Sequence, residues 1–306
     1  MLHFSVRKLR AFCLVAVSIA CLWLTGDEAR VMLPPKLAFA GAMPATVVWA
    51  WEEPEDLRSA ADVGVAYLAE TLMVGSAAGN AGAVRTAPRH QPLAVAPGAR
   101  VMAVVRLIAT PGFIDSPETR SQTAAALALA ARSNGIRAFQ VDFDATRSQR
   151  AFYASVLSQL RTQMPPGMPL SITALLSWCS ASPEGGVWLS NLPIDEAVPM
   201  YFRLGGNSRP GGDKTGYTIR EPKCRGSIGV STDESWPPLQ GNVRVYLFAP
   251  RPWTAAQLAA LPEIHDRYRP AALNRVNDTA RKPPNDTGLP PDTSASDTDT
   301  SQGGTP

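Results

Sequence analysis

Eight short runs of apolar residues recur between residues 46 and 249, and most of them are continuous rather than alternating. Continuous apolar runs of this length are typical of parallel strands that are buried on both faces. We therefore expect eight strands, at residues 46–51, 63–68, 101–108, 137–144, 169–176, 196–202, 226–231 and 243–249.

Helix signals follow several of these runs. Ser116 can accept hydrogen bonds from the free N–H groups of a first helical turn, and Pro117 suits that turn, so a helix is expected to begin there. Residues 148–163 repeat apolar side chains every four residues, which predicts an amphipathic helix. Thr254 and Gln257 have the spacing of a capping box at the start of a last helix.

Strands that alternate with helices predict an α/β fold, and eight strands fit a (β/α)8 barrel of the TIM type. The pattern has gaps, because residues 75–100 show no helix signal, residues 205–226 read as a long loop, and no helix is evident after the seventh strand. We therefore expect a degenerate or elaborated barrel, with an open α/β sheet as the structural alternative.

The ends of the chain are expected to lie outside the barrel domain, which we assign to residues 45–270. Basic residues precede an apolar run at residues 11–24, as in a secretory signal. A membrane span needs roughly 20 apolar residues, so residues 1–40 are predicted to be either a signal peptide or an N-terminal membrane anchor, with a linker. Residues 38–40 (Ala-Phe-Ala) have the small-x-small form of a cleavage site. Residues 271–306, rich in Pro, Thr, Ser and Asp, are predicted to be disordered.

An exported protein would be periplasmic, associated with the cell envelope or secreted, and this changes how the cysteines are interpreted. Of the four cysteines, Cys13 and Cys21 lie in the predicted leader. The remaining pair, Cys179 and Cys224, is then expected to form a disulfide. A zinc site lacks partners, because none of the three histidines is near a cysteine in the sequence. No metal is therefore expected.

Composition and motifs exclude several function classes. The chain is 45% hydrophobic and 18% charged with a net charge of +3, and it has no basic stripe, so no nucleic-acid partner is expected. It has no Walker loop and no dinucleotide fingerprint, so no cofactor is expected. The absence of a G-x-S-x-G motif and the scarcity of histidine argue against a Ser-His-Asp triad.

The strongest candidate chemistry lies in the sequence FQVDFDA of the fourth run. Gln140, Asp142 and Asp144 alternate with apolar residues and share one face of a strand. Buried carboxylates are costly unless they are paired or hydrogen-bonded, so this pair indicates a site. The alternative interpretation is that the two aspartates only neutralise Arg106 or Arg203 in an ion-pair network.

In a (β/α)8 barrel, functional residues gather at the C-terminal ends of the strands. Acids, arginines and aromatic residues occur at several of these ends. A carbohydrate site requires this combination, because aromatic rings stack on sugars and paired carboxylates act as acid and base or nucleophile. The candidate catalytic residues are Asp142, Asp144, Glu52 and Glu234. The candidate residues for contact with a polysaccharide or oligosaccharide are Trp51, Arg106, Trp178, Tyr201 and Arg203.

Several of these candidates have a plain structural alternative. Glu52 and Glu53 would be favourable charges at the N-terminus of a helix. Trp178 and Trp253 would serve core or lid packing. Glu234 lies in a polar loop, where a carboxylate is commonly solvated.

Three motifs in the order GIRAFQVDFDAT, PLSITALLSWC and DEAVPMYFRLG resemble a bacterial family of exported proteins described as the domain-of-unknown-function family numbered 3142. The resemblance covers residues 46–253. It implies the domain boundaries and an exported protein, and it implies no particular chemistry.

A more distant similarity relates the fourth run to chitinase-like barrels of glycoside hydrolase family 18, which carry D-x-D-x-E on the fourth strand and M-x-Y on the sixth. Asp142 and Asp144 match the two aspartates, Met200 and Tyr201 lie near the second motif, and Thr146 occupies the position of the catalytic glutamate. One hypothesis is therefore a glycoside-hydrolase-like enzyme that acts on a cell-envelope or extracellular polysaccharide with another acid. The second is a non-catalytic carbohydrate-binding or envelope scaffold protein.

Overall fold

The computed structural model describes most of the predicted barrel domain. The predicted signal or anchor segment, apart from residue 39, and the predicted tail from residue 271 lie outside the described residues. The described residues are 39, 41–60, 62–77, 80–180, 188–204, 218–239 and 243–261.

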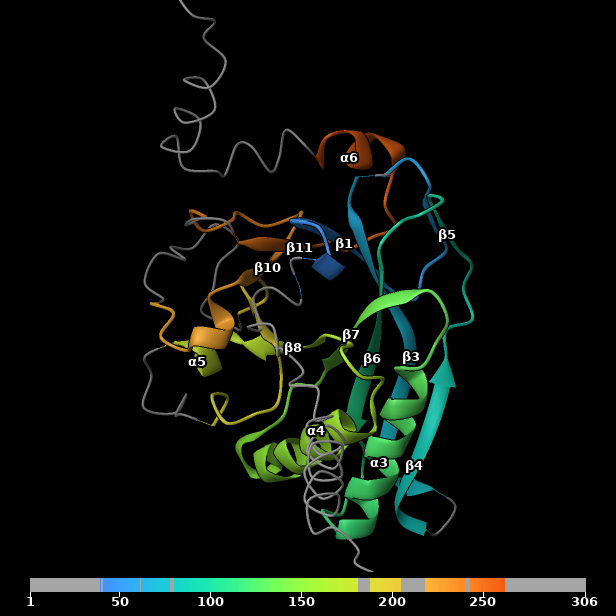
Figure 1. Cartoon of the computed structure of the whole chain (residues 1–306), viewed down its shortest axis with the longest axis vertical. Helices are drawn as coiled ribbons and strands as arrows, with labels where there is room; N and C mark the ends of the chain where they lie inside the picture. The colour runs from blue at the N-terminus through green and yellow to red at the C-terminus, as the bar shows by residue number, and fades with distance from the viewer. Residues whose placement is uncertain are drawn as a thin grey trace, which may run out of the picture.

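Eight parallel strands form a closed barrel (Figure 1). They are β1 (Thr46–Ala50), β3 (Gly64–Ala77), β6 (Val101–Ala109), β7 (Ile136–Asp142), β8 (Leu170–Leu175), β9 (Glu196–Met200), β10 (Ser227–Ser231) and β11 (Arg244–Phe248). The order around the barrel is β1, β11, β10, β9, β8, β7, β6 and β3, and β1 pairs with β3 to close it. Each predicted apolar run forms one of these strands. The closed barrel is therefore confirmed, and the open sheet is wrong.

Helices follow the strands at two places as predicted. In the described part of the chain the connections hold α3 (Pro117–Ala130), η1 (Arg147–Gln149), α4 (Arg150–Gln163), α5 (Leu176–Cys179), η2 (Pro222–Cys224) and, after the last strand, α6 (Ala255–Ala259). Only α3 and α4 are long, and they pack against each other outside the barrel (Figure 1). The regular helix of a TIM barrel is thus present after β6 and β7, and shorter elements are described elsewhere.

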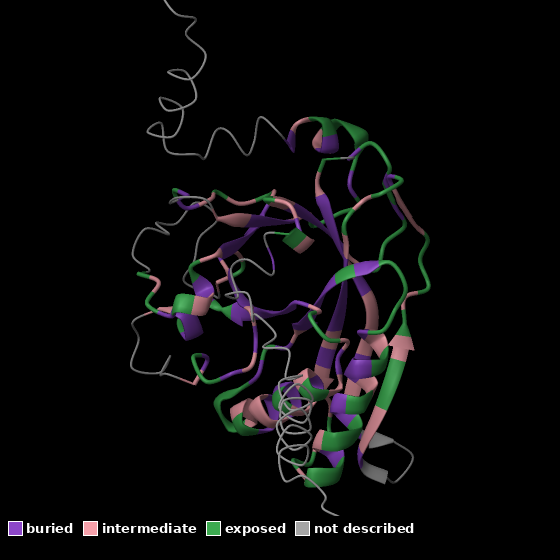
Figure 2. Ribbon diagram, viewed as in Figure 1, coloured by how far each residue is buried: buried purple, intermediate pink, exposed green. Residues whose placement is uncertain are grey.

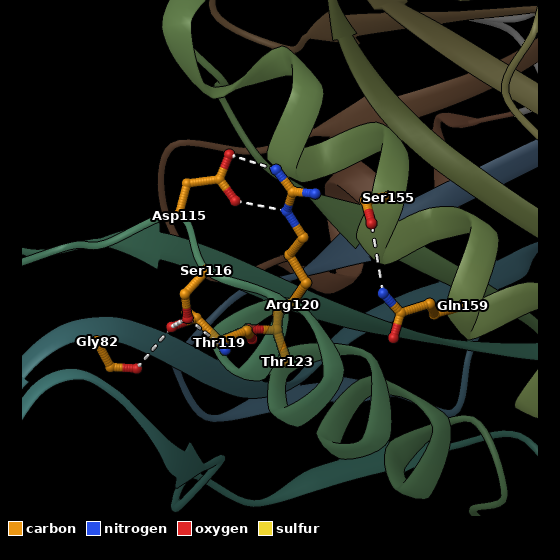
Figure 3. A network of polar contacts seen from close by, with 8 residues as sticks. All are labelled: Gly82, Asp115, Ser116, Thr119, Arg120, Thr123, Ser155 and Gln159. Atoms are coloured by element: carbon orange, nitrogen blue, oxygen red, sulfur yellow. Dashed lines mark hydrogen bonds and ion pairs between the residues drawn. The ribbon is translucent and has the colours of Figure 1, made fainter.

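The start of α3 is held by a network of polar contacts (Figure 3). The backbone N–H of Thr119 donates to the Ser116 side chain at 3.1 Å, which confirms the predicted cap. Asp115 forms an ion pair with Arg120, with nitrogen–oxygen distances of 2.5 and 2.8 Å. The Thr119 hydroxyl also donates to the carbonyl of Gly82 at 3.5 Å, which connects the helix to the neighbouring strand.

The second barrel strand continues far past the predicted run. It pairs antiparallel with β4 (Asn80–Pro88). The Gly, Ala and Pro content of this stretch hides the strand pattern in the sequence. Pro54 precedes β2 (Glu55–Leu57), which pairs in parallel with β5 (Leu93–Val95). The interpretation of Glu52 and Glu53 as charges at a helix N-terminus is therefore wrong.

Alternating side chains of the barrel strands point into the barrel or outward from it, and both sides carry apolar clusters. Buried residues follow these strands (Figure 2). The interior core contains Val47, Trp49, Ala66, Met102, Val104, Ala138, Val198 and Tyr246. The largest outer cluster packs α3 and α4 against β3, β6, β7 and β8. Continuous apolar runs arise because both faces of each strand are covered.

A buried polar network closes the N-terminal end of the barrel. Glu196, 4% exposed, accepts hydrogen bonds from Arg244 at 2.6 Å and from the Tyr246 hydroxyl at 2.6 Å. Burial, together with the negative charge of Glu196, raises the pKa of Tyr246 well above its usual value. The Arg244 guanidinium also lies over the Phe39 ring, 5.1 Å from its centroid. Phe39 was assigned to the linker, yet it is 2% exposed in the interior core.

The predicted disulfide is present. Cys179 in α5 is bonded to Cys224 in η2, with a sequence separation of 45. Both cysteines are buried in the outer cluster. Within the described residues, every helix is too short or too polar to cross a membrane.

Loss of this disulfide is expected to destabilise the barrel. A crosslink across 45 residues restricts the unfolded chain, so the Cys179→Ala/Cys224→Ala variant should lose about 2–4 kcal/mol of unfolding free energy. Urea denaturation of the oxidised protein and the variant tests this prediction. Equal midpoints and equal slopes would contradict it.

Candidate functional site

A cavity of about 490 Å³ opens where the C-terminal ends of the barrel strands meet. Its charged residues come from five of these ends and its aromatic residues from three. The lining residues are Trp49, Trp51, Glu53, Glu55, Arg106, Asp142, Asp144, Leu175, Met200, Phe202, Arg203, Ser231, Phe248, Ala249, Pro250 and Arg251. The barrel thus brings residues from most of its strands into one site.

Asp142 is the last residue of β7, is half-buried and lines this cavity. Its carboxylate accepts a hydrogen bond from the Thr173 hydroxyl on the neighbouring strand at 2.6 Å. The pKa of Asp142 is raised from 3.8 to about 6. Burial is the main cause, and the charge of Asp144 acts in the same direction. The Thr173 hydrogen bond and the charge of Arg106 act in the opposite direction. Asp142 therefore retains its proton to much higher pH than an ordinary aspartate.

Asp144 follows the strand end and is exposed, so it differs from Asp142 although both line the cavity. Because β7 ends at Asp142, the two-residue period of the strand does not place Asp144, which reaches the same cavity from the loop that follows. The arrangement pairs a half-buried carboxyl group with an exposed one, and environments of this kind separate acid from base roles in hydrolases.

Aromatic rings form one wall of the cavity. Trp49 and Trp51 stack with their ring centroids 5.4 Å apart. Phe248 lies 4.4 Å from Trp49 and 4.6 Å from Phe202, by centroid distance. Trp49 is buried in this wall, and the partly exposed side chains of Trp51, Phe202 and Phe248 line the cavity together with the two aspartates. Such surfaces bind the apolar faces of sugar rings.

Glu55 is a cavity residue that the sequence interpretation missed. Its side chain is 7% exposed and accepts a hydrogen bond from the backbone N–H of Trp253 at 2.9 Å. Burial raises its pKa above the usual value. The Trp253 indole also donates to the carbonyl of Trp49 at 2.8 Å, so one residue positions both the acid and the aromatic wall. The sequence of β2 is Glu-Asp-Leu, so it has no apolar alternation that could have identified the strand or the burial of Glu55.

Five predicted site residues line the cavity together: Trp51, Arg106, Asp142, Asp144 and Arg203. The other four, Glu52, Trp178, Tyr201 and Glu234, do not line it. These four lie outside the cavity because successive residues of a strand point to opposite sides, and because the loops after the strands follow different paths.

The expected contact of Trp178 with a sugar is not supported, because its side chain is 2% exposed and its ring packs edge-on against Trp188 at 5.0 Å. Tyr201 is 6% exposed and follows Met200, which faces the cavity, so Tyr201 lies in an outer cluster. Trp253 is also buried in that cluster, in agreement with the packing alternative.

Glu234 does not line the cavity, but it contacts the backbone of a residue that does. Its carboxylate accepts the backbone N–H of Arg203 at 3.0 Å. Arg203 has a φ of 51°, a left-handed conformation that is uncommon for residues other than glycine. An exposed ion pair with Asp233, at 3.6 Å, also holds the Arg203 side chain. Glu52 is exposed outside the cavity.

The geometry argues against an ion-pair network of the two aspartates with Arg106 and Arg203. Asp142 and Asp144 form no salt bridge with Arg106 or Arg203 within 4.0 Å, and all four residues belong to the described part of the chain. The charge of Arg106 still influences the pKa of Asp142 at longer range. Asp142 and Asp144 therefore do not serve only to neutralise Arg106 and Arg203.

No group of three or more His, Cys, Asp or Glu side chains able to hold a metal ion occurs within the described ranges.

Residues 97–198 match the protein family described as Domain of unknown function (DUF3142). This match begins before β6 and ends within β9, so it contains Arg106, Asp142 and Asp144. No curated protein and no solved structure matches the chain.

The raised pKa of Asp142 predicts a particular pH dependence of stability. Folding favours the protonated carboxyl group, so the wild type loses stability as the pH rises from about 4 to about 6. Asp142→Asn keeps an acceptor for Thr173 and removes the titration. The variant should therefore gain roughly 1–3 kcal/mol relative to wild type between low and neutral pH.

Urea denaturation at a series of pH values from 4 to 8 measures this difference. Asp62→Asn is the matched control, because Asp62 is an exposed aspartate outside the cavity. Parallel pH curves for wild type and Asp142→Asn would show that the carboxyl group titrates normally.

Proposed function

We propose that this protein is a glycoside-hydrolase-like enzyme whose site is the mouth of the barrel. The observation that carries the proposal is one cavity that combines a half-buried and an exposed aspartate with a wall of aromatic rings. Glycoside hydrolysis requires one carboxyl group that is protonated and another that is ionised, beside a surface that holds a sugar ring.

Asp142 and Asp144 have environments suited to these two roles. Asp142, with a pKa raised to about 6, would donate its proton to the glycosidic oxygen as the bond to the leaving sugar breaks. The exposed Asp144 would stabilise the positive charge that develops on the sugar ring, or activate water. Glu55 and Glu53 line the same cavity and replace Glu52 and Glu234 as candidates for a further carboxylate.

One observation favours the alternative, a protein that binds carbohydrate without cleaving it. Thr146, at the position of the chitinase-like catalytic glutamate, is exposed and forms a capping box with Gln149 before α4. That position therefore supplies no acid to the cavity. Hydrolysis would depend on Asp142 or Glu55 as the acid, and a site in which neither reaches the glycosidic oxygen would only bind.

The ligand would be an extracellular or cell-envelope polysaccharide if the protein is exported, as the sequence leads us to expect. The disulfide between Cys179 and Cys224 fits an oxidising compartment such as the periplasm or the cell exterior. The basic and apolar segment at the start of the sequence adds the expectation of a signal peptide or membrane anchor.

A screen of the purified full chain against envelope and extracellular glycans tests the proposal, with binding and reducing-end release measured together. Release should fall by a factor of about 10²–10⁴ in Asp142→Asn and in Asp144→Asn, while binding is retained. Release by wild type should also decline as the pH rises through about 6, because the acid then loses its proton.

Asp62→Asn serves as the control and should release sugar at the wild-type rate. Binding without release in wild type would establish the alternative function. No binding to any glycan, or release that survives both cavity substitutions, would refute the assignment of the site.

A further inference from the structure

Arg106 presents a cation to the cavity and has no carboxylate partner among the described residues. It lies near the end of β6, is partly buried, and lines the cavity. Its guanidinium lies over the Trp51 ring, 5.2 Å from the ring centroid. Among the residues that the structure describes, no carboxylate oxygen lies within 4.0 Å of its nitrogen atoms.

The missing ion pair is unexpected from the strand register. Arg106 is aligned with Asp142 on the adjacent strand, so the two side chains start from neighbouring positions on the same face. The Asp142 carboxyl group instead accepts the hydrogen bond from Thr173. Asp144 is exposed beyond the strand end. The protein thus holds a guanidinium next to two acids without using it to neutralise either.

A partly buried guanidinium has lost part of its hydration, and a ring face compensates only part of that loss. The donors of a guanidinium form a planar fork that matches the two oxygens of a carboxylate. A ligand carboxylate beside Trp51 would therefore complete the hydrogen bonding of Arg106. A neutral sugar would leave these charged donors with weaker partners.

We infer that the ligand is an acidic glycan, in which a sugar bearing a carboxylate, such as a uronic acid, is bound by Arg106 beside Trp51. This inference rests on the proposed function, because it names the class of sugar that the same site takes. The aromatic wall would hold the sugar rings, and Arg106 would select the acidic one.

The other charges of the cavity are compatible with this selection. Arg203 and Arg251 also line the cavity, from the ends of β9 and β11. Glu55 is buried and hydrogen-bonded to the Trp253 N–H, so it is not presented like the exposed Asp144. Both signs of charge are therefore present, and selectivity must come from local pairing with Arg106 rather than from a strong overall field.

The test compares acidic oligosaccharides with their own carboxyl-reduced forms, which keep the linkage and length and lose the charge. The probes are oligomers of galacturonate, of mannuronate and of alternating glucuronate, each measured with the full chain by calorimetry or fluorescence. Wild type should bind at least one acidic oligomer about 10- to 100-fold more tightly than its reduced form. Raised salt should weaken the acidic oligomer more than the reduced one.

Arg106→Gln should abolish this preference while the reduced oligomer keeps its affinity, and Arg106→Lys should retain only part of it. Arg137→Gln is the matched control, because Arg137 is exposed near the opposite end of the barrel and does not line the cavity. It should leave the preference unchanged. Thermal denaturation of each variant checks that the fold is intact.

The outcomes separate this inference from the proposed function. Equal or tighter binding of the reduced oligomers, or an equal loss for both forms in Arg106→Gln, would overturn the acidic-glycan inference and leave a carbohydrate site in place. Binding of neither form, together with silence in the wider glycan screen, would overturn both.

Discussion

The pairing of β1 with β3 is the contact on which the site depends. Their parallel register, from Val47 with Gly64 to Ala50 with Tyr67, closes the sheet into a barrel. Closure brings the aromatic residues at the end of β1 across from the charged residues at the ends of β6 and β7. An open sheet with the same strands would leave these groups on distant edges. The cavity is therefore a consequence of closure rather than of any one segment.

The two ends of the barrel have different chemistry. At the N-terminal end Glu196, Arg244 and Tyr246 satisfy one another, and Phe39 packs over the arginine. The polar groups at this end pair with one another, since an unpaired buried charge would destabilise the fold. At the C-terminal end Asp142 and Arg106 lie near each other and remain unpaired. The contrast supports a ligand role for the second set, because the first shows that this chain can pair buried charges.

The sequence predicted much of the site, but not all of it. The alternation of FQVDFDA placed Asp142 and Asp144 on one side, and the strand ends placed Trp51, Arg106 and Arg203 at the same rim. The sequence-based prediction was wrong where the path of a loop decides whether a side chain reaches the cavity. Glu55 enters the cavity because β2 pairs with β5, a contact between segments far apart in sequence. Trp178 and Tyr201 follow strand ends like true rim residues, but their rings turn outward into the core.

By itself, the sequence determined the eight strands, the caps of α3 and α6, and the cysteine pair, because apolar periodicity, capping residues and cysteine number are local or compositional signals. Only the tertiary structure decided which charges meet. Burial and the Thr173 hydroxyl affect the pKa of Asp142 in opposite directions, and Arg106 lies over the Trp51 ring rather than against a carboxylate of the described residues. These properties depend on distances between strands and on the exclusion of water, which arise only when the barrel closes.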